Sequence, residues 1–171
     1  MVKDNQILVV DDEIVIRELM SGILEDEGYK VVTAANGAMA LDLLQERDDF
    51  VVLITDIMMP EMDGIELIRE AAKVRPSLIS IVMTGYGTME SARSAVQAGA
   101  YDYVLKPFNL SEVKVSVSNA LDRFRLTSEN TRLLEITELF EISQSMASIR
   151  DEEELLDFVL KAALDRAVAV R

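Results

Sequence analysis

The sequence predicts an α/β fold: a doubly wound, five-stranded parallel sheet of the flavodoxin-like order 2-1-3-4-5, followed by an extended C-terminal helical tail. Two observations lead to this expectation. Short apolar segments alternate with helical patterns of about ten residues, which is typical of parallel sheets with right-handed crossovers. In addition, no glycine or proline interrupts residues 125–149, which favours a long helix that continues beyond the sheet. Half of the 171 residues are apolar, which is enough for a sizeable buried core.

The strands are expected where apolar and β-branched residues cluster, at 7–10, 30–33, 51–54, 78–82 and 101–104. The first, third and fourth of these segments are almost continuously apolar. Such segments are typical of strands that are covered on both faces, because neither row of side chains then meets water. Both faces of these three strands should therefore be covered by helices.

The helices are expected at about 13–27, 37–46, 64–73 and 88–97, with a fifth beginning near 110. Two of the starts are marked by capping boxes, in which a cap residue precedes a glutamate by three positions. These are Asp63 before Glu66 and Asn109 before Glu112.

The pattern changes after Phe124, so we predict one domain at 1–124, a helical linker at 125–150 and the start of a further domain at 151–171. The linker carries an apolar stripe formed by Leu126, Leu133, Ile136, Leu139, Phe140, Ile142, Met146, Ala147 and Ile149. An apolar stripe on a polar helix needs a covering surface, which favours a coiled coil and a homodimer through the C-terminal helix.

Composition excludes several classes of function. The chain has no cysteine and no histidine, which removes disulfides, thiol or histidine catalysis and metals held by nitrogen or sulfur. Its formal net charge is −14 and neither part is basic, so we expect no direct binding of nucleic acid. No apolar run approaches the roughly 20 residues that span a bilayer, and no signal peptide opens the sequence. We therefore expect a cytoplasmic protein without a membrane partner.

Polar residues stand where the predicted strands end. Asp11 and Asp12 follow the first strand, Asp56 ends the third, Thr84 the fourth and Lys106 the fifth. The carboxyl ends of parallel strands meet at one edge of the sheet, where ligands collect at the switch in strand order. Carboxylates crowded together favour a hard cation such as Mg²⁺. A carboxylate beside Mg²⁺, an ammonium and a hydroxyl is a competent set for phosphoryl transfer.

The sequence here resembles a known family. The pair Asp11-Asp12, the segment 56–64, Thr84-Gly85 and Lys106-Pro107 are similar, in order and spacing, to the response-regulator receiver signature, over about residues 4–124. Each motif alone is weak, and an acidic pair is more often a solvated or helix-capping feature. The joint placement of all four is specific.

The resemblance implies that Asp56 is the phosphoacceptor. It implies that Asp12, Asp56 and the Met58 carbonyl bind Mg²⁺, with Asp11 acting mainly through bound water. The resemblance also implies that Lys106 bridges acceptor and phosphoryl group from before a cis peptide bond to Pro107.

Further roles follow from the same resemblance. Thr84 is expected to move to the phosphoryl oxygen while Tyr103 reorients. A sensor histidine kinase is the expected donor. The chain is not expected to be a turnover enzyme, although it should catalyse its own Mg²⁺-dependent phosphotransfer and autodephosphorylation. The switch would transmit a conformational change to a C-terminal output module.

Other functions stay open at this point. A Mg²⁺-dependent aspartate phosphatase would carry its nucleophile in Asp-x-Asp after the first strand, where this chain has Asp11-Asp12-Glu13. A DNA-binding transcription factor would need a basic helix-turn-helix after the first domain, whereas this tail is acidic. A stand-alone module whose output is dimerisation is a milder alternative. Residues 133–156 resemble the opening helices of a GAF domain, which implies a truncated GAF-like output domain.

Overall fold

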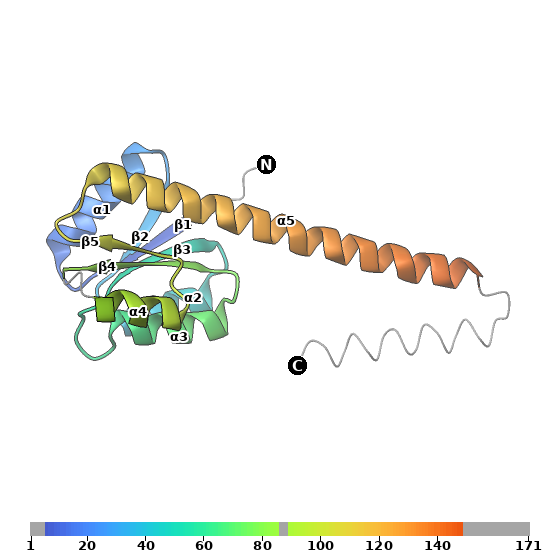
Figure 1. Cartoon of the computed structure of the whole chain (residues 1–171), viewed down its shortest axis with the longest axis horizontal. Coiled ribbons are helices and arrows are strands. Elements are labelled where there is room, and N and C mark those ends of the chain that lie inside the picture. Colours follow the sequence, from blue (N-terminus) through green and yellow to red (C-terminus); the bar gives the residue numbers. More distant parts are fainter. Residues whose placement is uncertain (1–5, 86–88, 149–171) are drawn as a thin grey trace. The chain divides into compact units, whose positions relative to one another are not determined.

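The structure, a computed structural model, describes residues 6–85 and 89–148 (Figure 1). Within these residues, five parallel strands form a sheet in the order β2-β1-β3-β4-β5. The strands are β1 (Gln6–Val10), β2 (Lys30–Ala34), β3 (Phe50–Asp56), β4 (Ile79–Thr84) and β5 (Asp102–Leu105). The predicted fold class and strand order are therefore confirmed.

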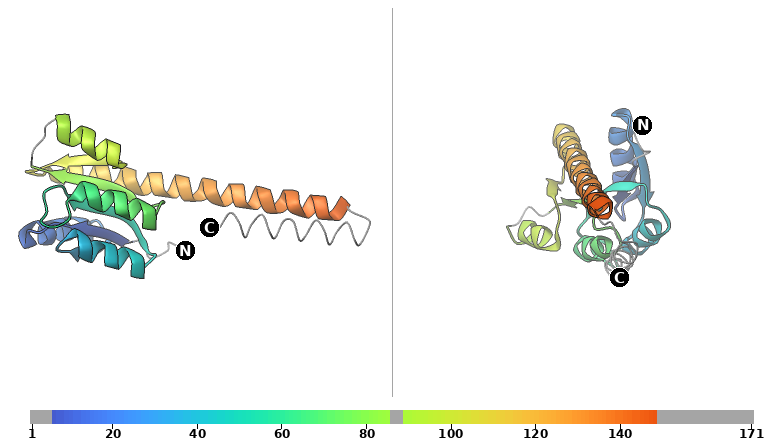
Figure 2. Two further views of the ribbon diagram at one scale, coloured as in Figure 1. Left: turned by 90° about the horizontal axis from the view of Figure 1, so that it is seen from below. Right: turned by 90° about the vertical axis from the view of Figure 1, so that its right-hand side faces the viewer.

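Helices cover both faces of this sheet. They are α1 (Ile14–Asp26), α2 (Gly37–Glu46), α3 (Gly64–Val74), α4 (Met89–Ala98) and α5 (Leu110–Ser148). Helix α1 and the first turns of α5 pack on one face, and α2, α3 and α4 pack on the other (Figures 1 and 2). The result is a three-layer arrangement with a buried apolar cluster on each side of the sheet.

The residues of β1 show how the sequence fills both layers. Ile7 and Val9 belong to the cluster beneath α1 and α5, whereas Leu8 and Val10 belong to the cluster beneath α2 and α3. All four are 0–1% exposed. A strand between two helical layers needs apolar side chains on both faces, which is why this segment shows no polar alternation.

Side chains cap two helices where the sequence predicts a start. The Asp63 carboxylate accepts a hydrogen bond of 2.7 Å from the Glu66 N–H at the beginning of α3. Asn36 caps α2 in the same way, by accepting from the Met39 N–H at 2.8 Å. Helix α1 differs, because its N-cap residue Glu13 makes no side-chain capping bond.

The long helix α5 contains 39 residues and runs through both compact units of the chain, Met1–Thr127 and Ser128–Arg171. In the first unit, Val113, Val117 and Ala120 bury it against the sheet. The coiled-coil linker and its boundary at 124 stay predictions, and the GAF-like start at 151–171 lies outside the described residues. No helix in the described part of the chain is long and apolar enough to cross a membrane.

Candidate functional site

Two buried carboxylates mark the carboxyl end of the sheet. Asp11 directly follows β1 and is 0% exposed, and Asp56 is the last residue of β3 and is 6% exposed. Strands β1 and β3 are hydrogen-bonded neighbours, with β2 beyond β1 and β4 beyond β3. The two acids therefore lie at the switch in strand order, which is where the sequence predicts them.

The Lys106 ammonium joins these two carboxylates. Its Nζ lies 2.8 Å from Oδ2 of Asp11 and 2.7 Å from Oδ1 of Asp56. Burial by itself lowers the pKa of Lys106, but the hydrogen bonds and charges of the two carboxylates outweigh it and raise that pKa above its usual value. The lysine therefore stays protonated at neutral pH and presents a fixed positive charge between the acids.

Backbone N–H groups hold the other oxygen of each carboxylate. The Met58 N–H donates to Oδ2 of Asp56 at 2.7 Å, and the Glu13 N–H donates to Oδ1 of Asp11 at 2.9 Å. Each acid thus receives an ammonium on one oxygen and a backbone amide on the other. Such charge-assisted bonds are short and directional, so the orientation of both carboxylates is fixed before any ligand arrives.

Asp12 is in a different environment from its neighbour Asp11. Its side chain is exposed, and within the described residues its carboxylate accepts no hydrogen bond. Among those residues, no three acidic side chains form a ready cage for a metal ion. A Mg²⁺ ion that keeps several waters needs only one or two protein carboxylates. Assigning Asp11, Asp12, Asp56 and Met58 to a metal site stays a prediction.

The glycine at the start of α3 sets the position of the Asp56 backbone. The Gly64 N–H donates to the Ile57 carbonyl at 3.0 Å, and a Cβ atom at position 64 would overlap the Asp56 carbonyl oxygen. Only a glycine allows α3 to approach β3 so closely. The peptide bond between Lys106 and Pro107 is cis, as the resemblance implied.

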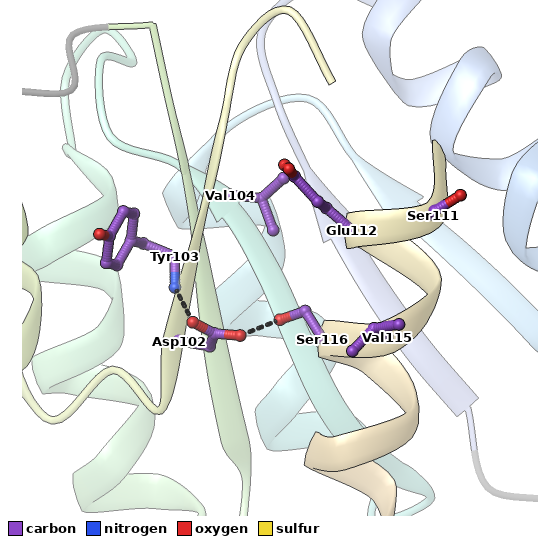
Figure 3. A pocket seen from close by; sticks show the side chains of 7 residues that line it. All are labelled: Asp102, Tyr103, Val104, Ser111, Glu112, Val115 and Ser116. Carbon is purple, nitrogen blue, oxygen red and sulfur yellow. Dashed lines mark hydrogen bonds between the residues drawn. The ribbon is translucent and has the colours of Figure 1, made fainter. Parts of the chain in front are cut away.

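The two residues expected to act as the switch lie on neighbouring strands. Thr84 ends β4 and is 4% exposed, whereas Tyr103 on β5 is 46% exposed. In Figure 3 the Asp102 carboxylate lies between β5 and α5, where it accepts from the Tyr103 N–H at 2.8 Å and the Ser116 hydroxyl at 2.6 Å. Asp102, Tyr103 and Ser116 line a pocket of about 360 Å³, and its lining does not include Asp11, Asp12 or Asp56.

Sequence reasoning overlooked one residue at the acidic site. The Arg17 guanidinium donates to the carbonyl oxygens of Asp11 and Asp12, at 2.6 and 3.0 Å. The available signal was a cation near the N-terminal end of a helix, a place that the helix dipole disfavours. Asp102 was read only as part of a strand, because its bond to Ser116 joins elements that the sequence pattern cannot bring together.

Comparison with known proteins agrees with this geometry. The family model described as "Response regulator receiver domain" matches residues 7–118. The chain is 38% identical over 121 residues to the transcriptional regulatory protein ZraR of Klebsiella oxytoca, covering 71% of this chain and 27% of ZraR. It is 36% identical over 119 residues to the sporulation initiation phosphotransferase F of Bacillus subtilis, covering 69% of this chain and 94% of that protein.

Solved structures give the same answer. A response regulator receiver domain protein from Clostridium thermocellum superposes with a TM-score of 0.68 at 33% identity, over 72% of this chain and 98% of the other. The chain thus spans about a quarter of ZraR but nearly all of two smaller proteins. With its sheet order and its lysine-bridged aspartates, the chain belongs to the response regulator receiver domain family.

Proposed function

We propose that this receiver domain is a phosphorylation-dependent switch in which Asp56 accepts a phosphoryl group from a sensor histidine kinase in the presence of Mg²⁺. The observation that carries the proposal is the contact of the Lys106 ammonium with the carboxylates of both Asp11 and Asp56. This contact supports the proposal because a carboxylate that could act as a nucleophile lies next to a fixed positive charge, at the edge of the sheet where ligands bind in such folds.

The chemistry follows from these groups. An Asp56 carboxylate oxygen attacks the phosphorus of the donor, and a P–O bond to Asp56 forms while the bond to the leaving group breaks. The leaving group keeps the electron pair and takes up a proton. Lys106 stabilises negative charge on the phosphoryl oxygens, and the Met58 N–H holds the acceptor in place.

The residues present fit a hard cation. Oxygen ligands are available from Asp12, Asp56 and the Met58 carbonyl, and the chain has no histidine or cysteine to attract a softer metal. The single Lys106 ammonium contacts two carboxylates, those of Asp11 and Asp56, which leaves a net negative charge that a divalent ion would balance. When bound, Mg²⁺ would neutralise charge on the transferring group. Asp11 would act mainly through bound water, as the resemblance to the receiver signature implies.

Phosphorylation would then act on β4 and β5. The new anion favours the state in which the Thr84 hydroxyl reaches it, and Tyr103 fills the space that Thr84 vacates. The buried position of Thr84 and the exposed position of Tyr103 support this starting arrangement. The pairing of β4 with β5 gives the two residues a direct structural connection.

Labelling with acetyl phosphate and Mg²⁺ tests the acceptor, with intact-protein mass spectrometry as the readout. Wild type should gain the mass of one phosphoryl group and Asp56→Asn should not. Asp63→Asn is the matched control, because it makes the same change at an exposed aspartate of the following loop and asparagine caps helices equally well. Equal labelling of wild type and Asp56→Asn would remove Asp56 from its role.

We further propose that two chains associate through the C-terminal part of α5. In the described residues this part exposes large apolar side chains at half to two thirds of their area: Leu126, Leu133, Leu134, Ile136, Leu139 and Phe140. Burying each is worth about 1.5–3 kcal/mol, so several together could outweigh the cost of association.

Light scattering tests this association. The full chain should have twice the mass of its monomer at tens of micromolar, and a version ending at Phe124 should be a monomer. A monomeric full chain would contradict the proposal and favour a tail that covers its stripe within one chain. A dimeric short version would move the interface to the receiver domain itself.

A further inference from the structure

The guanidinium of Arg17 occupies an unusual place beside the acidic pocket. Arg17 lies near the beginning of α1, whose N-cap residue Glu13 gives no side-chain hydrogen bond and whose first turn contains no acidic residue. The N-terminal end of a helix carries partial positive charge, so a cation there is unfavourable unless it has other partners. The partners of Arg17 are the carbonyl oxygens of Asp11 and Asp12.

These two carbonyls belong to the two peptide groups that flank the Cα atom of Asp12. One Arg17 nitrogen, Nη1, donates to both of them, at 2.6 Å and 3.0 Å. Fixing both flanking peptide planes fixes φ and ψ of Asp12, because only these two dihedrals are soft in each residue. The direction of the Cα–Cβ bond of Asp12 is then fixed too, although its exposed carboxylate has no hydrogen-bond partner among the described residues.

We infer that Arg17 is a positioning residue for cation binding, which orders the exposed carboxylate of Asp12 through the backbone. The inference rests on the Mg²⁺ site proposed above. Asp11 needs no such help, because Lys106 and the Glu13 N–H already hold its carboxylate. Asp12 depends on its backbone, which Arg17 restrains at both flanking carbonyls and the Asp11 carboxylate restrains at the Glu13 N–H.

Electrostatics alone predicts the opposite change in Mg²⁺ affinity when Arg17 is removed. Removing a positive charge near an acidic pocket should strengthen the binding of a cation, because like charges repel. Removing a positioning group should weaken it, since outer partners of metal ligands typically change metal affinity by about 10–100-fold. The substitution Arg17→Met keeps the aliphatic part of the side chain and removes both the charge and the donors. The two explanations can therefore be separated by the direction of the change.

Isothermal titration of the full chain with MgCl₂, without any phosphoryl donor, measures this directly. The dissociation constant of Arg17→Met should be about tenfold higher than that of wild type. Lys73→Met, which removes one exposed charge from α3, is the control and should bind like wild type. An unchanged or lower constant for Arg17→Met would overturn the inference. Failure of wild type to bind Mg²⁺ would instead overturn the proposed site, and the inference with it.

Amide hydrogen exchange gives a second readout that needs no metal. The Glu13 N–H, bonded to Asp11 Oδ1, reports the order of the loop. Without Mg²⁺, it should exchange faster in Arg17→Met than in wild type, while amides of β1 and β3 keep their protection and show that the fold is intact. Unchanged exchange at Glu13 would show that Arg17 does not order the loop, and would overturn the inference even where the affinity falls.

Discussion

Replacing Gly64 by alanine should lower the stability of the protein and displace the proposed acceptor, Asp56. In Gly64→Ala the new Cβ would overlap the carbonyl oxygen of Asp56, and would lie 2.9 Å from its carbonyl carbon and 3.1 Å from Cα of Ile57. All three atoms are backbone, so no side chain can turn away. Carbon and oxygen without a covalent bond keep about 3.3 Å apart, so α3 and the end of β3 must separate.

The size of the effect follows from three contributions. Overpacking a rigid site costs about 1–3 kcal/mol, and weakening the bond from the Gly64 N–H to the Ile57 carbonyl adds about 1 kcal/mol. Alanine is favoured over glycine within a helix by about 1 kcal/mol, which offsets part of this. We expect the free energy of unfolding to fall by about 1–3 kcal/mol. Labelling of Asp56 should also slow, because a displacement of an ångström can reduce a reaction rate by about a hundredfold.

Urea unfolding of three proteins tests this reasoning. Gly22→Ala is the matched control, because Gly22 lies within α1 and an added Cβ meets no atom within 4 Å. That variant should be more stable than wild type by about 0.5–1 kcal/mol. Equal stability of Gly64→Ala and wild type would refute the close approach of α3 to β3. Destabilisation of both variants alike would show that the loss of glycine, and not the contact, is responsible.

Three further predictions concern the pocket. Asp12→Ala should lose most of the rise in melting temperature that Mg²⁺ gives wild type, because a ligand that binds the folded state stabilises it; an equal rise would contradict the ligand assignment. Lys106→Met should lower the free energy of unfolding by about 2–3 kcal/mol, because two buried carboxylates lose their shared cation. The control Lys114→Met removes an exposed ion pair and should lower the free energy of unfolding by less than about 1 kcal/mol. Similar losses of stability in the two variants would argue that the burial of Asp11 and Asp56 does not strengthen their ion pairs with Lys106. Beryllofluoride, standing in for the phosphoryl group, should shift the amide signals of α4 and of Tyr103, and shifts confined to the acids would argue against the switch.

Much of the fold could be predicted because its signals are local. Apolar continuity identifies strands that are covered on both faces. Cap residues such as Asp63 mark helix starts, because the cap residue and the N–H that it accepts from are only three positions apart. Parallel order then places Asp11 and Asp56 at the same edge of the sheet without further information. The site was therefore predictable at the level of which strand ends meet.

What the sequence could not predict are contacts between groups that no pattern relates. The bond from Lys106 to Asp11 joins residues 95 positions apart, and its geometry depends on the packing of the whole sheet. The role of Arg17 was hidden for another reason, because its partners are backbone carbonyls, which every residue has. A side chain that donates to backbone carbonyls needs no partner of a particular residue type, so no second residue in the sequence indicates the contact.

The neighbours Asp11 and Asp12 show why residue type alone does not assign a role. Asp11 is buried, and an ammonium and a backbone amide already occupy its two oxygens, so it stabilises the pocket before any ligand binds. Asp12 is exposed and accepts no hydrogen bond within the described residues, so it can take a ligand at little cost. Asp12 also differs from Asp56, because the Lys106 ammonium contacts Asp11 and Asp56 and no ion pair within the described residues joins it to Asp12. Asp11 and Asp56 share a fixed orientation and the Lys106 cation, and what distinguishes Asp56 is its place as the last residue of β3, where α3 begins close enough to fix its backbone.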